Sequence, residues 1–271
     1  MKLFSKFNDF DLERSLKQVN YNEIASTYNE RYEAGSFEGI ASTLKSLIQN
    51  SSAKRILEVG CGTGHWLEKL QGVDRQVYGL DLSIGMLRQA DQGLKSVYLI
   101  CGQARYLPFF DACFDIIFCV NALHHFDQKQ KFISQARQAL RSGGILAIIG
   151  MDPHNGNNKW YIYHYFDGTY ETDLARFPSA KTIKEWMTEA GFEQIKCNLT
   201  ERIKKPLFGE EVLKTPYIQK HNSSQLILLS DEAYINGVNR IKADLRKAES
   251  LKKIIKFEVN ISLWLITGIA P

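Results

Sequence analysis

Three alternate glycines at the end of an apolar run are the strongest chemical signal in this sequence. The segment Ile56–Gly64 reads ILEVGCGTG, a buried-strand pattern that leads through Gly60, Gly62 and Gly64 into a helix. Glycine permits a tight turn and a close approach of backbone to a ligand, and a helix N-terminus offers N–H groups to an acceptor. The segment therefore predicts a nucleotide-like cofactor at this loop.

Acidic residues flank the loop in positions that separate two classes of cofactor. A second apolar run ends in Asp81, seventeen residues after Gly64, where a carboxylate can accept hydrogen bonds from both ribose hydroxyls. Glu58 lies just before the loop; it would repel a pyrophosphate but suits a cofactor that carries an ammonium and a sulfonium. His65 occupies the sixth position of a dinucleotide fingerprint, which disfavours NAD. These features fit S-adenosylmethionine.

Paired histidines follow the fourth apolar run, in the segment Asn121–Asp127 (NALHHFD). His124 and His125 are candidate catalytic acids or bases because imidazole titrates near neutrality, and a packing role at the strand–helix turn is equally open for either. Adjacent residues that leave a strand point apart, so these histidines and Asp127 are poorly spaced as metal ligands. We expect no metal.

Aromatic residues gather in two further places. Before the glycine loop lie Tyr21, Tyr28 and Tyr32; one of them, with Tyr28 as our candidate, could instead be the catalytic base or orient the substrate. Residues 160–166, WYIYHYF, together with Tyr170, offer a wall of rings for an apolar or aromatic substrate. The alternative for this second group is an amphipathic helix that caps the sheet.

The elements that must position these residues alternate between strands and helices. Strands are expected at Arg55–Val59, Val77–Asp81, Val97–Cys101, Phe114–Val120 and Gly144–Gly150, and helices at Gly64–Leu70, Ile84–Gln92 and Gln128–Leu140. Such alternation implies parallel βαβ units, and so a doubly wound α/β fold. Beyond Asp152 the pattern predicts a helix over Ala180–Ala190, a strand from Phe192 to about Leu199 and a last strand over Phe257–Thr267.

The chain shows no internal repeat and no Pro- or Ser-rich linker, so we expect a single domain over residues 1–271. Its parts are an amino-terminal helical cap (1–52), a cofactor-binding core (53–150) and a carboxy-terminal half (151–271) with insertions at 153–178 and 206–253. Insertions in α/β sheets usually lie where ligands bind, so both are candidate lids, although a surface helix is as plausible for the second. Residues 1–35 and 153–178 are expected to close over the site.

Together the motifs resemble the class I S-adenosylmethionine-dependent methyltransferases, most of all the branch of small-molecule and quinone-biosynthesis enzymes. The resemblance rests on LEVGCGTG, on YGLDLS with Met86 five residues after Asp81, and on LPF, FDIIFCVNALHHF and LRSGGILAI. It covers residues 53–150 firmly and the rest loosely. It implies a Rossmann-like sheet of seven strands in the order 3-2-1-4-5-7-6, with the last strand antiparallel.

The resemblance also implies roles by position. The cofactor-binding residues would be Glu58, Gly60, Cys61, Gly62, Gly64, Asp81, Leu82, Met86, Gln103, Ala104 and Asn121. In the family, Asp81 would hold the ribose, Leu82 and Met86 would pack on the adenine, and Asn121 would face the methionine moiety. Gln103 stands where the family usually has an acid, and its amide can still accept the hydrogen bond of the adenine amino group.

Composition leaves the partner open. Lys and Arg total 34 against 30 Asp and Glu, and a net charge of +4 implies no strong field for nucleic acid or an anionic membrane. Five scattered cysteines without a C-x-x-C pair fit a reducing compartment. No apolar stretch approaches the roughly 18 to 20 residues that span a bilayer, and Lys6, Asp9 and Asp11 interrupt any signal-peptide core. A soluble, cytoplasmic protein is expected.

The sequence thus predicts an enzyme that uses S-adenosylmethionine to methylate O, C or N of a small, apolar or aromatic metabolite. In-line displacement at a sulfonium needs alignment and, for a protonated nucleophile, a base. The alternative is a noncatalytic S-adenosylmethionine-binding or interaction subunit, and the third possibility is an NAD-dependent oxidoreductase. The expected partner is a small-molecule acceptor, without nucleic acid or stable membrane insertion.

Overall fold

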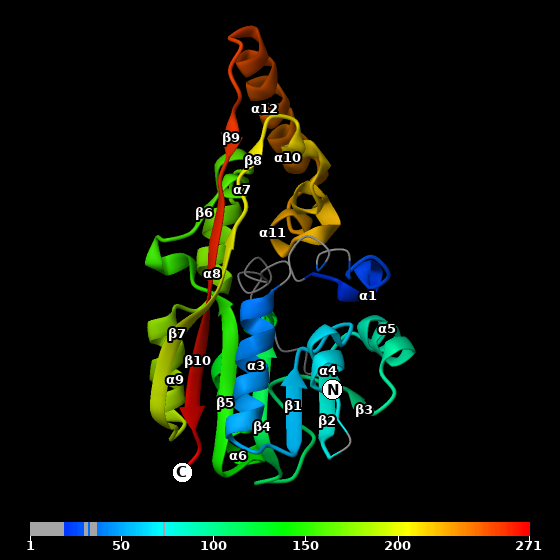
Figure 1. Cartoon of the computed structure of the whole chain (residues 1–271), viewed down its shortest axis with the longest axis vertical. Helices are drawn as coiled ribbons and strands as arrows, with labels where there is room; N and C mark the ends of the chain where they lie inside the picture. Colours follow the sequence, from blue (N-terminus) through cyan, green and yellow to red (C-terminus); the bar gives the residue numbers. More distant parts are fainter. Residues whose placement is uncertain (1–18, 30–31, 33–36, 73) are drawn as a thin grey trace, which may run out of the picture.

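A mostly parallel sheet forms the centre of the protein, which was analysed as a computed structural model that describes residues 19–29, 32, 37–72 and 74–271 (Figure 1). Over these residues, eight strands join one sheet: β1 (Arg55–Val59), β2 (Gln76–Asp81), β3 (Val97–Cys101), β4 (Phe114–Val120), β5 (Leu140–Met151), β6 (Lys159–Trp160), β7 (Glu193–Lys204) and β10 (Val259–Ile269). The order is β3-β2-β1-β4-β5-β10, and β10 also pairs with β6 and β7. A small second sheet joins β8 (Leu207–Phe208) to β9 (Lys256–Phe257).

The strand directions confirm the expected fold. The pairs between β1, β2, β3, β4 and β5 are parallel, whereas β10 runs antiparallel to both β5 and β7. Since β7 and β10 are the sixth and seventh long strands, the order is 3-2-1-4-5-7-6. β7 continues to Lys204, past the expected end near Leu199, because β10 pairs with it as far as Asn260. Pairing with β10 thus keeps residues 201–204 in a strand, although their charged sequence alone does not predict one.

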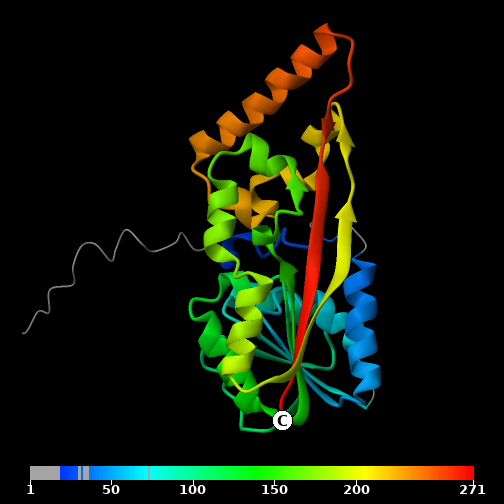
Figure 2. The same cartoon turned by 90° about the vertical axis from the view of Figure 1, so that its left-hand side faces the viewer.

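Helices cover both faces of the sheet (Figure 2). On one face lie α3 (Glu38–Asn50), α4 (His65–Leu70) and α5 (Ile84–Gly93); on the other lie α6 (Lys129–Ala139) and α9 (Ala180–Glu189). In α3, the buried residues Ile40, Leu44 and Ile48 recur every four positions, so one stripe of this helix meets the sheet. Because both faces are covered, every residue of β4 is buried.

The two insertions build a further layer above the carboxyl ends of the parallel strands (Figure 1). The first contributes α7 (Tyr161–Tyr165) and α8 (Thr169–Arg176), and the second contributes α10 (Glu211–Lys214), α11 (Ser224–Ile227) and α12 (Asp231–Ser250). Short α1 (Tyr21–Ile24) lies at the same end of the sheet. α12 projects away from the parallel strands, whereas α11 lies close above them. Residues 1–18, 30–31 and 33–35 of the expected amino-terminal lid (1–35) lie outside the described residues.

The expected wall of rings at residues 160–166 is mostly directed elsewhere. Tyr161 packs edge-on against Phe257 of β9, with ring centroids 5.9 Å apart, and Phe166 stacks on Tyr234 of α12 at 5.9 Å. The Tyr165 hydroxyl donates to Asp244 of α12 over 2.8 Å. These rings attach α7 to α12 and β9. The prediction that they form a wall for the substrate is therefore wrong for Tyr161, Tyr165 and Phe166.

No helix in the described part of the chain is both long enough and apolar enough to cross a bilayer.

Candidate active site

The glycine loop takes a backbone conformation that L-residues with side chains rarely adopt. Gly60, Gly62 and Gly64 have φ values of 76°, 54° and 78°, in the left-handed region where a Cβ is costly. A Cβ on Gly60 would lie 2.5 Å from that of Ala122, in the turn after β4. The φ values explain why glycine is needed at all three positions, and the Ala122 contact shows how closely the loop approaches the turn.

The backbone N–H groups of the glycine loop form hydrogen bonds within the protein. Gly60 N and Cys61 N both donate to the carbonyl of Leu80, over 2.7 and 3.1 Å, and Gly62 N donates to Oδ2 of Asp81 over 2.8 Å. These bonds fasten the loop to the end of β2 and remove donors that a pyrophosphate would need. The geometry thus disfavours a dinucleotide for a reason independent of His65.

Gly64 has a different role from the other two glycines. It is the N-cap of α4, and a Cβ there would lie 2.5 Å from Cδ1 of Leu94, at the end of α5. It therefore permits close packing of these two helices, and it does not line the cavity described next.

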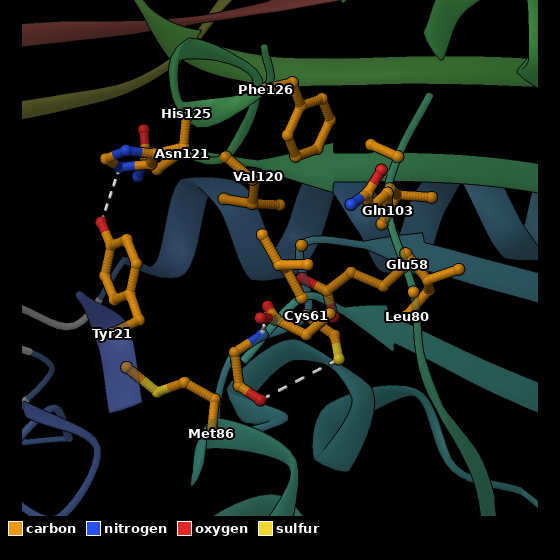
Figure 3. A pocket seen from close by; sticks show the side chains of 18 of the residues that line it. Tyr21, Glu58, Cys61, Leu80, Met86, Gln103, Val120, Asn121, His125 and Phe126 are labelled. Atoms are coloured by element: carbon orange, nitrogen blue, oxygen red, sulfur yellow. Dashed lines mark hydrogen bonds between the residues drawn. The ribbon is translucent and has the colours of Figure 1, made fainter. Parts of the chain in front are cut away.

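A first cavity, of about 250 Å³, opens at the carboxyl ends of β1, β2 and β4 (Figure 3). It brings together the residues assigned to the cofactor, apart from Gly64: Glu58, Gly60, Cys61, Gly62, Asp81, Leu82, Met86, Gln103, Ala104 and Asn121. The sequence reading missed the apolar members Trp66, Leu80, Val120 and Phe126. Their pattern predicts burial, and nothing in it separates a core contact from a cavity wall.

The first cavity has a negatively charged floor. Glu58 is only 1% exposed, and its Oε2 has no hydrogen-bond partner within the described ranges. Burial raises the pKa of Glu58 well above its ordinary value, and the nearby charge of Asp81 raises it further. Burial also raises the pKa of Asp81, against the opposing effect of the N–H groups of Ser83 and Gly62 that bond to it. Two such carboxylates favour a cationic ligand.

The amino-terminal segment closes one side of the first cavity. The Tyr21 hydroxyl lies 2.6 Å from Nε2 of His125 (Figure 3). Beside it, Asn22 Oδ1 accepts from the Ser83 hydroxyl over 2.8 Å and from Gly85 N over 2.9 Å. The ring of Tyr28 packs edge-on against that of Tyr21, with centroids 5.8 Å apart. α1 is thereby bonded both to the loop after β4 and to the start of α5.

The two histidines are neighbours in space but differ in which cavity walls they form. His125 lines the first cavity, whereas His124 is 9% exposed and stacks on Phe177, with centroids 3.8 Å apart and planes 13° apart. Both belong to a 3-10 turn, Leu123–His125, that follows β4, and their rings lie against each other with centroids 3.8 Å apart and planes 45° apart. The expectation that these adjacent side chains point apart is therefore wrong, because the chain leaves the strand as a turn. Asn121, at the end of β4, has a φ of 49°, which asparagine tolerates better than most residues.

A second cavity, of about 160 Å³, adjoins the first. The two share Tyr21, Tyr28, Tyr32, Trp66, Val120, Asn121 and His125. Its remaining wall includes Met151, Trp160, Phe177, Tyr217 and residues 222–225. Of the ring segment 160–166, only Trp160 takes part, while the start of α11 supplies a side that the sequence reading left undecided.

Comparisons with known proteins identify the family of this chain. Residues 57–148 match a methyltransferase domain family. The chain is 29% identical over 168 residues to a demethylmenaquinone methyltransferase of Thermotoga maritima, covering 54% of this chain and 73% of the relative. It is 26% identical over 200 residues to a malonyl-[acyl-carrier protein] O-methyltransferase of Herminiimonas arsenicoxydans, covering 69% and 70%. The chain belongs to the class I S-adenosylmethionine-dependent methyltransferases.

The structure of this methyltransferase also resembles solved ones. A phosphoethanolamine N-methyltransferase 2 of Haemonchus contortus, in complex with S-adenosyl-L-methionine, aligns with a TM-score of 0.57 at 18% identity, over 99% of this chain and 60% of that one. The cofactor is S-adenosylmethionine, so the NAD-dependent alternative is dropped. The buried Glu58 carboxylate, with an unpartnered oxygen at the cavity wall, fits the positive charges of this cofactor. The residues that the structure describes contain no group of three or more His, Cys, Asp or Glu placed to hold a metal ion.

Proposed function

We propose that this methyltransferase methylates an oxygen, carbon or nitrogen atom of a small apolar or aromatic molecule bound in the second cavity. The observation that carries the proposal is the junction of the two cavities, where Asn121, His125 and three tyrosines form a common wall. Rings such as Trp160 and Phe177 line the far side of the second cavity and suit a flat acceptor. S-adenosylmethionine supplies an activated methyl group when bound.

The remaining tasks fall to the chain: alignment, exclusion of water and removal of a proton. We assign proton removal to Tyr21 and His125, since both line both cavities and their polar atoms lie 2.6 Å apart. The phenol oxygen of Tyr21 takes the proton of the acceptor while its own proton passes to Nε2 of His125. This direction requires His125 to be neutral with Nε2 unprotonated before the reaction.

His124 and Tyr28 have other roles in this proposal. His124 stacks on Phe177, packs on the ring of His125 and lines the second cavity, but it does not line the first. Tyr28 forms part of the common wall and supports the ring of Tyr21.

The test uses S-adenosylmethionine with a labelled methyl group and a panel of small phenols, hydroxy acids and amines. Transfer of label to at least one member is expected, whereas tight cofactor binding without transfer to any member, or to a small-molecule extract, would contradict the proposal. With an accepted substrate, Tyr21→Phe and His125→Gln should each lower turnover by about 10² to 10⁴ and leave affinity for S-adenosylhomocysteine nearly unchanged. His164→Gln, at an exposed position of α7 that lines neither cavity, is the matched control and should retain wild-type turnover.

A further inference from the structure

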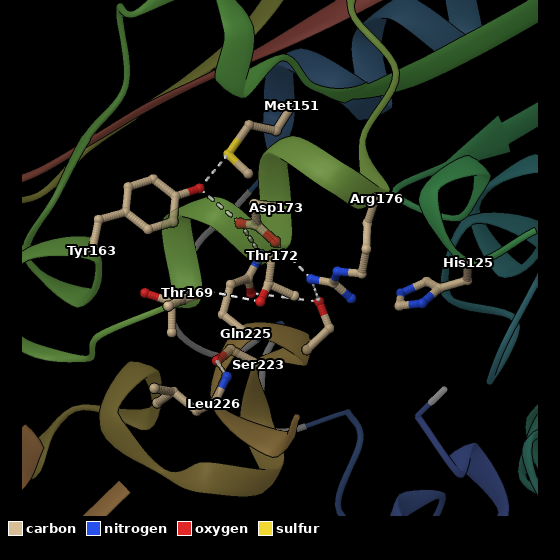
Figure 4. A network of polar contacts seen from close by, with 12 residues as sticks. His125, Met151, Tyr163, Thr169, Thr172, Asp173, Arg176, Ser223, Gln225 and Leu226 are labelled. Carbon is tan, nitrogen blue, oxygen red and sulfur yellow. Dashed lines mark hydrogen bonds and ion pairs between the residues drawn. The ribbon is translucent and has the colours of Figure 1, made fainter. Parts of the chain in front are cut away.

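A buried ion pair lies in the layer that covers the second cavity (Figure 4). Nη2 of Arg176, the last residue of α8, donates to Oδ1 of Asp173 over 2.6 Å and to the Ser224 hydroxyl of α11 over 3.2 Å. The other oxygen of Asp173 accepts from the Tyr163 hydroxyl over 2.7 Å and from Nε2 of Gln225 over 2.8 Å. Both carboxylate oxygens of Asp173 therefore have partners.

The guanidinium of Arg176, in contrast, has hydrogen-bond partners among the described residues for only one of its three nitrogen atoms. Arg176 is 5% exposed, and its Nε and Nη1 have no hydrogen-bond partner in the described part of the chain. A buried donor without a partner costs about 1 to 3 kcal/mol, and more when it is charged. Native proteins pair nearly all such groups, so an exception calls for a ligand or another reason. An ion pair with Asp173 alone does not account for these N–H groups.

The guanidinium is also next to the acceptor side of the site. Its two neighbours Phe177 and Ser224 line the second cavity, and its central carbon lies 5.6 Å from the centroid of the Phe177 ring. Figure 4 shows the guanidinium pointing toward the ring of His125, which lines the same cavity. Arg176 does not itself line this cavity; its guanidinium lies directly behind the wall formed by Phe177, Ser224 and His125, which an acceptor would touch.

A second cation lies near the guanidinium of Arg176. This cation is Lys129. Burial is the main cause that lowers the pKa of Lys129, and the positive charge of Arg176 lowers it further. Asp173 balances one of the two cations. Asp127, which also acts on Lys129, forms its own ion pair with Arg105 over 2.6 Å. Asp173 is the one carboxylate that pairs with Arg176 among the described residues, so a ligand carboxylate would be its second anionic partner.

We propose that the acceptor carries a carboxylate, which is held by the unpaired N–H groups of Arg176. This inference rests on the proposed function and names the substrate class of the same site. Charge-assisted hydrogen bonds from a guanidinium to a carboxylate are among the stronger ones in proteins. A cavity of about 150 Å³ can hold benzene, so the second cavity, at about 160 Å³, suits an acceptor with about one ring. The Ser224 hydroxyl accepts from Arg176 and donates to Oε1 of Gln225 over 3.4 Å, so Arg176 supplies the donors to the carboxylate.

The first experiment uses the wild-type protein saturated with S-adenosylhomocysteine. Calorimetry with benzoate and with benzamide compares two probes of nearly the same shape that differ in charge. Benzoate should bind at least about tenfold more tightly than benzamide, and equal or weaker binding of benzoate overturns the inference. A protein that fails to bind S-adenosylhomocysteine at all would contradict the proposed function, and the inference with it. The two failures are thereby distinguishable.

Variants then locate the effect. Arg176→Gln keeps an amide for Asp173 but removes the charge, and should abolish the preference for benzoate while affinity for S-adenosylhomocysteine stays within about twofold. Arg176→Lys keeps the positive charge but lacks the planar guanidinium with its paired donors, so it should retain part of the preference for benzoate. If the glutamine variant does not fold, the lysine variant provides the test. The matched control is Arg141→Gln, which breaks another Arg–Asp pair, that with Asp115, at the opposite end of β5. A folded Arg176 variant with an unchanged benzoate preference overturns the inference, since a purely structural role would affect both probes alike.

Discussion

The buried carboxylate of Glu58 should lower the free energy of unfolding of the ligand-free protein while it strengthens cofactor binding. The substitution Glu58→Gln tests both effects directly. The side chain is 1% exposed, one of its oxygens has no partner among the described residues, and a second carboxylate, Asp81, acts on it. Removing the charge relieves both the desolvation and the repulsion. Without ligand, we expect the variant to be more stable than the wild type by about 1 to 3 kcal/mol near pH 8.

The pH dependence gives the sign of the effect. Burial and then Asp81 raise the pKa of folded Glu58 above its ordinary value of 4.5. Below that ordinary value the residue is protonated in both the folded and the unfolded chain, so its charge does not affect stability. As the pH rises toward the folded pKa, the unfolded chain loses its proton first, and the folded state becomes less favourable. The stability gap between Glu58→Gln and wild type should therefore open above about pH 4.5 and be largest in alkaline solution.

Thermal unfolding from pH 4.5 to 8.5 measures this gap, at about 2 to 4 °C for each kcal/mol. Calorimetry should also show affinity for S-adenosylmethionine falling by about 10- to 100-fold, because a neutral amide loses a charge-assisted interaction. Glu68→Gln is the matched control: Glu68 is exposed on α4, and its loss should change neither quantity. A variant that is less stable than wild type at pH 8, or that binds the cofactor equally well, would refute the reasoning.

Two further predictions concern the rest of the first cavity. Asp81→Ala removes the acceptor of the Gly62 and Ser83 amides as well as two expected ribose hydrogen bonds, so cofactor affinity should fall by roughly 2 to 4 kcal/mol. Asp91→Ala, at an exposed position of α5, is its control in calorimetry, and equal affinity in both folded variants would mean that the ribose binds elsewhere. Hydrogen exchange should slow in residues 19–29 and 153–178 when S-adenosylhomocysteine binds, relative to β7. Equal protection with and without ligand would make these segments fixed caps.

The cofactor side of the site was predictable from the sequence because its signals are local. The left-handed turns of the loop require glycine at Gly60 and Gly62 whatever surrounds them, and Asp81 is placed by the end of a strand whose apolar run is plain. The sheet order was predictable for a related reason. Alternating strands and helices allow few connections in a parallel sheet.

The acceptor side was not predictable, because it depends on contacts between residues far apart in the chain. Tyr21 and His125 are separated by 104 positions, and Arg176 and Ser224 by 48. The periodicity of residues 160–166 indicates an amphipathic helix, but not whether its rings meet a cavity or another helix. In this structure the rings of Tyr161 and Phe166 contact β9 and α12. Residues 222–225, at the start of α11, line the second cavity where those rings were expected.

Two buried charges with unused hydrogen-bonding capacity mark opposite sides of the joined cavities. Glu58 presents a carboxylate at the first cavity, and Arg176 presents a guanidinium beside the wall of the second. Each costs stability unless a ligand of opposite charge is present. A cationic cofactor and an anionic acceptor would satisfy both, and each would bind where the protein disfavours the other. Since the two sites have opposite charge, removing the charge of either, by Glu58→Gln or Arg176→Gln, should weaken the binding of one ligand and leave affinity for the other nearly unchanged.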